Sequence, residues 1–300
     1  MTDVVDEVLP AAAELEAAPG GRRVRFRMTR MLLSSWRTRI TLGIVLLVIV
    51  ASIVGPMLSP YGVNEQILSD RLQSPSGSHL LGTDSLGRDV LTLVLAGTWL
   101  SIVAGLLAVL TAVILGVPSG LLAGYRGGVF GSMSNAASDT LLSLPPLILA
   151  LAIVGAYGGG VTAAMLAVGV TMAPRFYRVS RGVASSVSQE SYVEAARSIG
   201  SSTSRILTRH VFTNAVAPLL VQVSFSIGLA IIAEASLSFV GLGAQPPQVS
   251  LGTMARDAFT HIRESPFGIL PPCVMIAVIV YLFASLGDSL RDSLVSGGKR

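Results

Sequence analysis

Long apolar runs constrain the fold of this chain more than any other feature. Hydrophobic residues make up 51% of its 300 residues and charged residues 13%, and the mean hydropathy is +0.70. This balance is not that of a soluble domain. Several of the runs reach about 20 residues, which is long enough for a helix to cross a hydrocarbon core of about 30 Å. The sequence therefore predicts an all-α, polytopic membrane protein.

Six transmembrane helices are expected from the positions of these runs. They cover residues 38–58, 99–123, 133–156, 161–176, 211–240 and 270–286. Pro118 lies near the end of the second run, and Leu144, Pro145 and Pro146 interrupt the third. Two polar stretches rich in turn-forming residues, 59–96 and 241–268, are predicted to be loops on one side of the membrane.

The basic residues predict the orientation. Of the 21 lysines and arginines, 17 fall in segments that the six-helix topology places inside, and four (Arg71, Arg88, Arg256 and Arg263) fall in the outside loops. This bias predicts that both termini are cytoplasmic. The predicted parts are a cytoplasmic tail with a basic run (1–37), the first transmembrane helix (38–58), an external loop (59–96), a five-helix core (97–292) and a cytoplasmic tail (293–300).

One long charged segment, 189–214, interrupts the apolar body. Tyr192, Val193, Ala196 and Ile199 have helical spacing, which predicts a short helix with one apolar face. Gly200 is expected to end that helix, and Ser201, Ser202 or Thr203 to cap a second one. Two short helices around a glycine turn, between membrane spans, predict a docking element for another protein.

This segment resembles the EAA loop of ABC importer permeases. Glu194-Ala195-Ala196 is followed after three residues by Gly200, and after nine more by His210. The resemblance implies a type I importer permease fold, with a cytoplasmic coupling loop at 189–210. Thr213 departs from the family pattern, which has a proline there. The residues implied in docking an ATPase are Tyr192, Glu194, Ala195, Ala196, Arg197 and Gly200.

Three further motifs resemble the dipeptide and oligopeptide branch of that family, in its second-permease type. They are His79 to Val90 (HLLGTDSLGRDV), Glu234 to Pro247 (EASLSFVGLGAQPP) and Gly287 to Asp292 (GDSLRD). The resemblance implies a permease that forms half of a path for di- or oligopeptides across the bacterial inner membrane. Nickel or another small peptide-like solute, such as glutathione, remains an alternative cargo.

The resemblance also implies the partners. They are a homologous permease, two ATP-binding subunits that hold ATP and magnesium, an external substrate-binding protein and the lipid bilayer. The sequence contains no phosphate-binding G-x-x-x-x-G-K-[ST] stretch, and no catalytic, metal or cofactor site is expected in this chain. Nucleic acid is not expected as a partner, because the arginines cluster at the ends of the spans. A secondary transporter that works alone on an ion gradient is the alternative from another class.

Ionisable residues within the spans were weighed as functional candidates. Glu234, with Ser238 one turn later, is a candidate for a substrate path or gate, although hydrogen bonding of Glu234 to a nearby hydroxyl or backbone group is favoured. Asp139 is expected either to have such a role or to pair with an arginine. Asp84 and Asp89 are expected to cap turns, with Arg88 paired to one of them, in preference to a metal site with His79.

Overall fold

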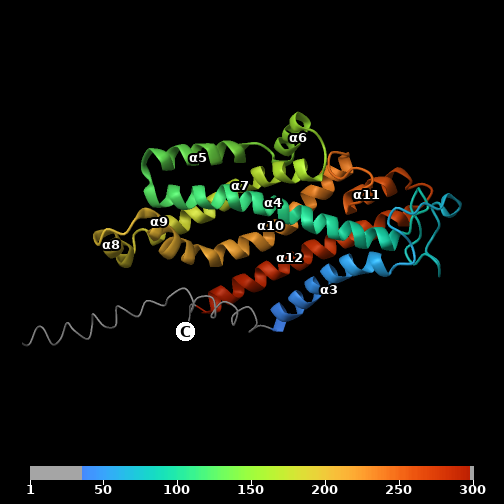
Figure 1. Cartoon of the computed structure of the whole chain (residues 1–300), viewed down its shortest axis with the longest axis horizontal. Coiled ribbons are helices and arrows are strands. Elements are labelled where there is room, and N and C mark those ends of the chain that lie inside the picture. Colours follow the sequence, from blue (N-terminus) through green and yellow to red (C-terminus); the bar gives the residue numbers. More distant parts are fainter. Residues whose placement is uncertain (1–35, 298–300) are drawn as a thin grey trace, which may run out of the picture.

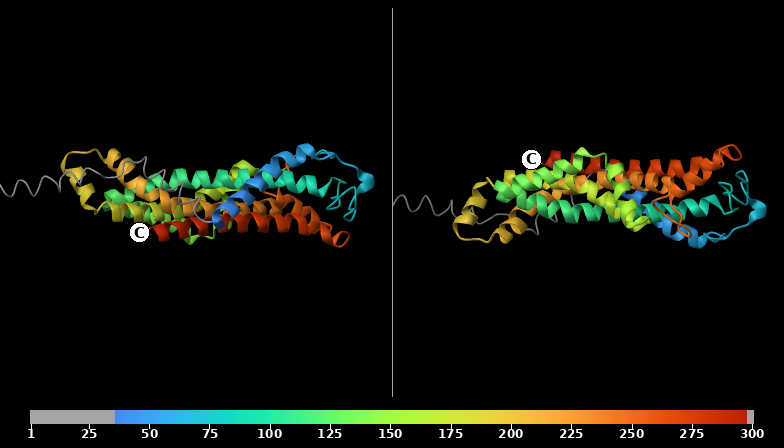
Figure 2. Two further views of the ribbon diagram at one scale, coloured as in Figure 1. Left: turned by 90° about the horizontal axis from the view of Figure 1, so that it is seen from below. Right: turned by 90° about the horizontal axis from the view of Figure 1, so that it is seen from above.

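The computed structural model describes residues 36–297, in which every regular element is helical and no strand occurs. Figures 1 and 2 show an elongated bundle. Two short helices, α8 (Ser191–Ser198) and α9 (Thr203–Ile206), lie at one end. The loop of residues 59–89 lies at the opposite end, with α11 (Leu251–Thr260) on the same side. We call these the elbow end and the loop end.

Five long helices form the body of the bundle. Helix α4 packs most extensively against α7, α10 packs on both of them and on α12, and α3 covers the outside of α4 and α12. The bounds of the five helices are Trp36–Leu58 for α3, Val90–Arg126 for α4, Val161–Val187 for α7, Phe212–Val240 for α10 and Leu270–Gly297 for α12. Two shorter helices, α5 (Gly128–Ser143) and α6 (Pro146–Tyr157), lie outside α7.

The number of membrane spans differs from the six that we expected. In the described part, four segments are long and apolar enough: Thr38–Leu58, Val90–Arg126, Thr203–Val240 and Pro266–Asp292. The predicted third span is broken, because its two halves, α5 and α6, meet at 93° around Leu144 and Pro145. If α5 and α6 together form one membrane span, the described part has five spans instead of four. Helix α7 is long enough, but three arginines in its second half lower its hydropathy.

Several helices extend beyond the spans that were predicted for them. Helix α4 starts at Val90 because Asp89 caps it, with the Thr92 N–H donating to Asp89 Oδ2 at 2.9 Å, so the last seven residues of the predicted loop 59–96 are helical. Helix α7 continues to Val187, and α12 continues to Gly297. The predicted loop 241–268 contains α11, whose first turn is capped by reciprocal hydrogen bonds between Ser250 and Thr253. The predictions for residues 1–35 and 298–300 lie outside the described residues.

Three glycines set the distance between α4 and α7. Gly116, Gly120 and Gly124 recur every four residues, so they form a stripe along one face of α4. A Cβ added to them would collide with the carbonyl oxygens of Ala173, Tyr177 and Arg181 in that order. Because the residue numbers of the contacts increase together along α4 and α7, the two helices run parallel. Small residues at such spacing let membrane helices approach at backbone distance.

We predict that Gly120→Ala lowers the thermal stability of the purified protein in detergent. The added methyl would meet the backbone of Tyr177, and overpacking of a tight interface typically costs about 1–3 kcal/mol. Gly182→Ala in α7 is the matched control, because a Cβ there meets nothing within 4 Å while the intrinsic helix preference changes equally. Equal melting temperatures for the two variants would contradict the role given to the stripe.

Candidate functional site

The segment between α7 and α10 folds as the predicted elbow. Helix α8 ends at Ser198, and Gly200 adopts a φ of +80°, a left-handed conformation that favours glycine. The Gly200 N–H donates to Arg197 O at 3.0 Å, and the Ser201 N–H donates to Ala196 O at 3.0 Å, which closes the helix end. Ser202 then caps α9 by accepting from the Arg205 N–H. The predicted glycine turn and serine cap are both confirmed.

The faces of α8 differ from the prediction. Val193 is fully buried, and Ala196 is 9% exposed, so both pack against the rest of this chain. Tyr192 and Ile199, predicted to share their face, are 44% and 83% exposed. Ala196 thus packs on its own chain here, and its predicted role in docking stays a prediction. The outward surface of the elbow is formed by Glu194, Ala195, Arg197 and Ile199.

Two side chains tie the elbow to the long helices. The amide of Asn214, at the start of α10, donates to the Tyr192 hydroxyl at 3.3 Å, and the Tyr192 ring lies 5.8 Å from that of His210. Partial burial, and to a smaller extent the charge of Glu190, raises the pKa of Tyr192, while the Asn214 hydrogen bond opposes this rise. The guanidinium carbon of Arg197 lies 5.2 Å from the centre of the Tyr125 ring, at the end of α4. Tyr192 and Arg197 therefore contact their own bundle, a role that the sequence did not indicate.

The connection between α9 and α10 is one wide helical turn, Leu207–Val211. Wide turns of this kind are frequent at functional positions in helices. Thr213, in place of the proline of the family pattern, stays within the helix and donates its hydroxyl to Arg209 O at 3.0 Å. The helical path from α9 into α10 is therefore uninterrupted at Thr213.

The candidate gate residues are buried inside the bundle. Glu234 and Ser238 in α10 are both 0% exposed. The Ser101 hydroxyl on α4 donates to Glu234 Oε2 at 2.8 Å, and the Ser238 hydroxyl donates to Oε1 at 2.7 Å. The expected hydroxyl partner of Glu234 is therefore confirmed. The substrate-path role of the pair stays a prediction.

At the loop end, buried polar contacts organise residues 59–89. Asp84 accepts from the backbone N–H groups of Leu86 and Arg88, and its ion pair with Arg88 Nε measures 2.6 Å. The predicted turn capping and ion pair are confirmed. His79 Nδ1 lies 3.1 Å from Asp89 Oδ1, and the Tyr61 ring lies 4.5 Å from the imidazole. Among the described residues, no group of three histidine, cysteine or acidic side chains is placed to hold a metal ion.

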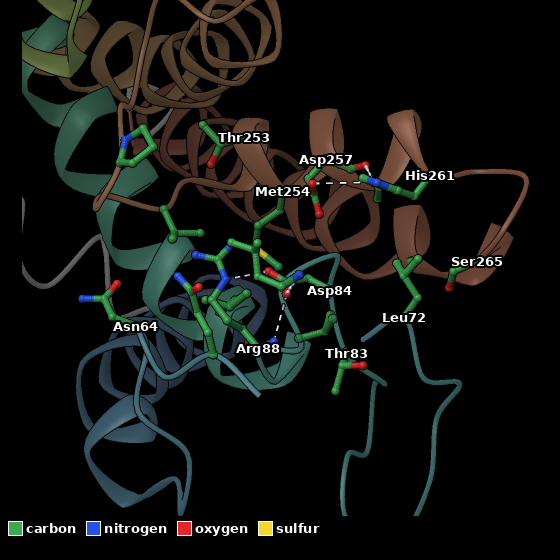
Figure 3. Close-up of a pocket in the computed structure, with 18 of the residues that line it drawn as sticks. Asn64, Leu72, Thr83, Asp84, Arg88, Thr253, Met254, Asp257, His261 and Ser265 are labelled. Carbon is green, nitrogen blue, oxygen red and sulfur yellow. Dashed lines mark hydrogen bonds and ion pairs between the residues drawn. The ribbon is translucent and has the colours of Figure 1, made fainter. Parts of the chain in front are cut away.

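A cavity of about 560 Å³ lies between this loop and α11 (Figure 3). The Asp84–Arg88 pair forms one wall, and Met254 and Asp257 of α11, with His261 directly after this helix, form the other. The Ser85 hydroxyl donates to Asp257 Oδ1 at 2.7 Å and joins the two walls. The sequence does not predict this cavity as long as residues 241–268 are taken to be a loop without a helix. The Ser250 and Thr253 spacing was the available signal for a helix there.

Asp139 of α5 has the arginine partner that was expected as one of its two roles. Its Oδ1 accepts from Arg178 of α7 at 2.8 Å, on an exposed face of the bundle. Exposed pairs of this kind contribute about 0–1 kcal/mol. The contact therefore positions α5 on α7 without contributing much stability.

Comparison with known proteins identifies the family. The family described as binding-protein-dependent transport system inner membrane component matches residues 116–297. The chain is 38% identical to the glutathione transport system permease protein GsiD of Escherichia coli O1:K1 / APEC, over 90% of this chain and 88% of that protein. It is 39% identical to GsiD of Pectobacterium atrosepticum, over 83% of each chain.

Solved structures support the same fold. An inward-facing structure of the MetNI methionine ABC transporter matches with a TM-score of 0.56 at 19% identity, covering 67% of this chain and 96% of that one. A second crystal form of MetNI gives a TM-score of 0.55 with the same coverage. At this identity the likeness concerns the fold, which is that of a type I ABC importer permease. The chain therefore belongs to the family of binding-protein-dependent transport system inner membrane components, the membrane-embedded permeases of ABC importers.

Proposed function

We propose that this permease forms half of the path by which di- or oligopeptides cross the bacterial inner membrane. The second half would come from a homologous permease, and ATP with magnesium would be bound by two partner ATPases. The curated relatives named above are glutathione permeases, so a tripeptide is within the proposed substrate class. Nickel chelates and other small peptide-like solutes are the alternative cargo.

The observation that carries the proposal is the exposed elbow at one end of the bundle. Its outward surface presents a nearly bare isoleucine, Ile199, beside the charged Glu194 and Arg197. In a protein contact, Ile199 can form part of the apolar centre, and the two charges can form the polar rim. We assign this surface to the ATPase. Of the six proposed docking residues, Ala196 acts from inside, by packing α8 on the bundle, and Gly200 acts through its backbone.

Orientation supplies the first test. The basic bias predicts that the elbow is cytoplasmic and that the loop end faces outward. In a Cys273→Ser background, a membrane-impermeant thiol reagent on intact cells should label Gly77→Cys and leave Ser201→Cys unlabelled. Permeabilised cells should show labelling of both positions. Labelling of position 201 in intact cells would contradict the proposed topology.

Energy coupling supplies the second test. Because this chain contains no phosphate-binding loop, we expect peptide uptake into proteoliposomes to require the ATPases, ATP and the external binding protein. Collapse of the proton gradient with an ionophore should leave the initial uptake rate unchanged. Uptake by the purified permeases alone, driven by a pH gradient, would instead support an ion-coupled secondary transporter.

The elbow itself supplies the third test. Gly200→Val should reduce peptide-stimulated ATPase activity of the assembled complex at least about tenfold, since a β-branched residue does not tolerate a φ of +80°. Gly200→Asn is the matched control, because asparagine adopts this conformation more readily, and it should retain most of the stimulation. A Cβ at this position meets nothing within 4 Å, so the comparison isolates the backbone turn from crowding.

Two surface variants separate docking from folding. Ala195→Trp adds bulk on the outward face and should reduce recovery of the ATPase with the purified permeases. Glu194→Ala should be milder, because an exposed charge contributes about 0–1 kcal/mol. Wild-type ATPase recovery and stimulation in both Gly200→Val and Ala195→Trp would exclude the elbow as the docking element.

A further inference from the structure

Arg175 is a charged residue near the middle of α7. It lies 14 residues after Val161 and 12 before Val187, or about 21 Å and 18 Å along a helix that rises 1.5 Å per residue. Arg175 is also the next-to-last residue of the span expected at 161–176, at the end that the basic residues place toward the cytoplasm. A charge so close to the apolar layer reaches the lipid headgroups, or it faces a water-filled cavity or a charged partner. The surroundings of Arg175 therefore indicate what that part of the bundle faces.

Within the described part of the chain, the Arg175 side chain is exposed and has no hydrogen-bond or ion-pair partner. Arg178, three residues later, is paired with Asp139 at 2.8 Å. Glu234, the ionisable residue in the apolar α10, is buried and accepts two serine hydroxyls. The bundle thus satisfies Glu234 internally and leaves the guanidinium of Arg175 free to bind another molecule.

The guanidinium belongs to a small cavity between the α5–α6 junction, α7 and α10, with a volume of about 180 Å³. Its walls are mostly apolar and include Pro146, Leu147, Met172 and Leu229. The two hydroxyls in the lining, of Thr171 and Ser236, donate to the backbone oxygens of Val168 and Ile232, each at 2.8 Å. Arg175 is the charged group of this lining, and its donors are uncommitted.

The lipid-facing surface of the bundle has a different character. On α3, the exposed residues at helical spacing are Ile44, Leu47, Val54 and Leu58, with no charge among them. Such a surface suits hydrocarbon, whereas an unpaired guanidinium does not. The surface formed by α6, α7 and α10 also contains the 93° break between α5 and α6. Non-helical backbone at membrane depth is tolerated where it lines a water-filled cavity or is covered by protein, so this surface suits a solute path or a protein contact.

We propose that Arg175 binds a carboxylate of the transported solute as it passes between the two permeases. This inference rests on the proposed function. A planar guanidinium binds a carboxylate through two parallel hydrogen bonds, and every peptide with a free C-terminus offers one. A volume of 180 Å³ is below the 300–1,000 Å³ of ordinary ligand pockets, so this chain supplies one wall and the partner permease supplies the other. Arg175 is then a specificity-determining residue for acidic or C-terminally free peptides.

The test compares each peptide with its amide in the complete complex. Permeases, ATPases and binding protein are reconstituted in proteoliposomes, and initial uptake rates are measured for trialanine and its C-terminal amide, and for glutathione and its glycine amide. The affinity of the binding protein for each form is measured separately, and uptake is compared at saturation. We expect Arg175→Gln to lower the carboxylate-to-amide rate ratio roughly tenfold or more, and Arg175→Lys to give an intermediate ratio.

Because the ratio compares two solutes in the same preparation, partial misfolding of a variant does not change it. Arg181→Gln is the matched control, since Arg181 is an exposed arginine on the same helix that lines a different cavity, and its ratio should equal that of the wild type. A wild-type ratio in Arg175→Gln would overturn the inference. An equal loss for both solutes that depends on the fraction of anionic lipid would also overturn it, by assigning Arg175 to a phospholipid headgroup. Absence of uptake of any of the four solutes by the wild-type complex would instead overturn the proposed function.

Discussion

The close approach of α4 and α7 is the constraint on which the rest of the structure depends. With glycine at positions 116, 120 and 124, the two backbones come into direct contact over about two turns of each helix. Hydrophobic burial cannot drive helix association inside a membrane, because lipid tails are as apolar as leucine. Close backbone packing therefore holds the helices together there, with interhelical hydrogen bonds such as that from Ser101 to Glu234. Helix α10 then lies across both members of the pair, and α3 and α12 complete the bundle.

Much of the fold follows from apolar run length, because a membrane helix must satisfy its own backbone groups. Run length predicts α3, α10 and most of α12, and the glycine and serines of the elbow predict its turn correctly. Run length is a poor guide where apolar and polar residues are mixed. Helix α7 carries three arginines, α4 begins inside a polar motif because Asp89 caps it, and α11 is amphipathic with a polar beginning. Each of these helices is fixed by caps and tertiary packing, which a hydropathy pattern does not represent.

The candidate site was predictable in its turns and unpredictable in its faces. Spacing alone placed Tyr192, Val193, Ala196 and Ile199 together, but α8 has little more than two turns. In so short a helix, the packing of the surrounding bundle decides which residues are buried, and of these four residues only Val193 and Ala196 are buried. The same limitation applies to Glu234. Its hydroxyl partner on the next turn was visible in the sequence, whereas Ser101 lies 133 positions away.

How the elbow connects to the bundle bears on how motion would pass through it. The polar ties, Asn214 to Tyr192 and Arg197 over Tyr125, are exposed or part-exposed contacts, each worth about 1 kcal/mol or less. The apolar contacts are stronger, since Val193, Ile206 and Val211 are fully buried and belong to the main core of the bundle. A force applied to α8 would therefore reach α10 through packed side chains, which do not compress. In the wide turn Leu207–Val211, the hydrogen-bond pattern departs from that of an α-helix. A change of angle between the elbow and α10 would therefore occur at this turn.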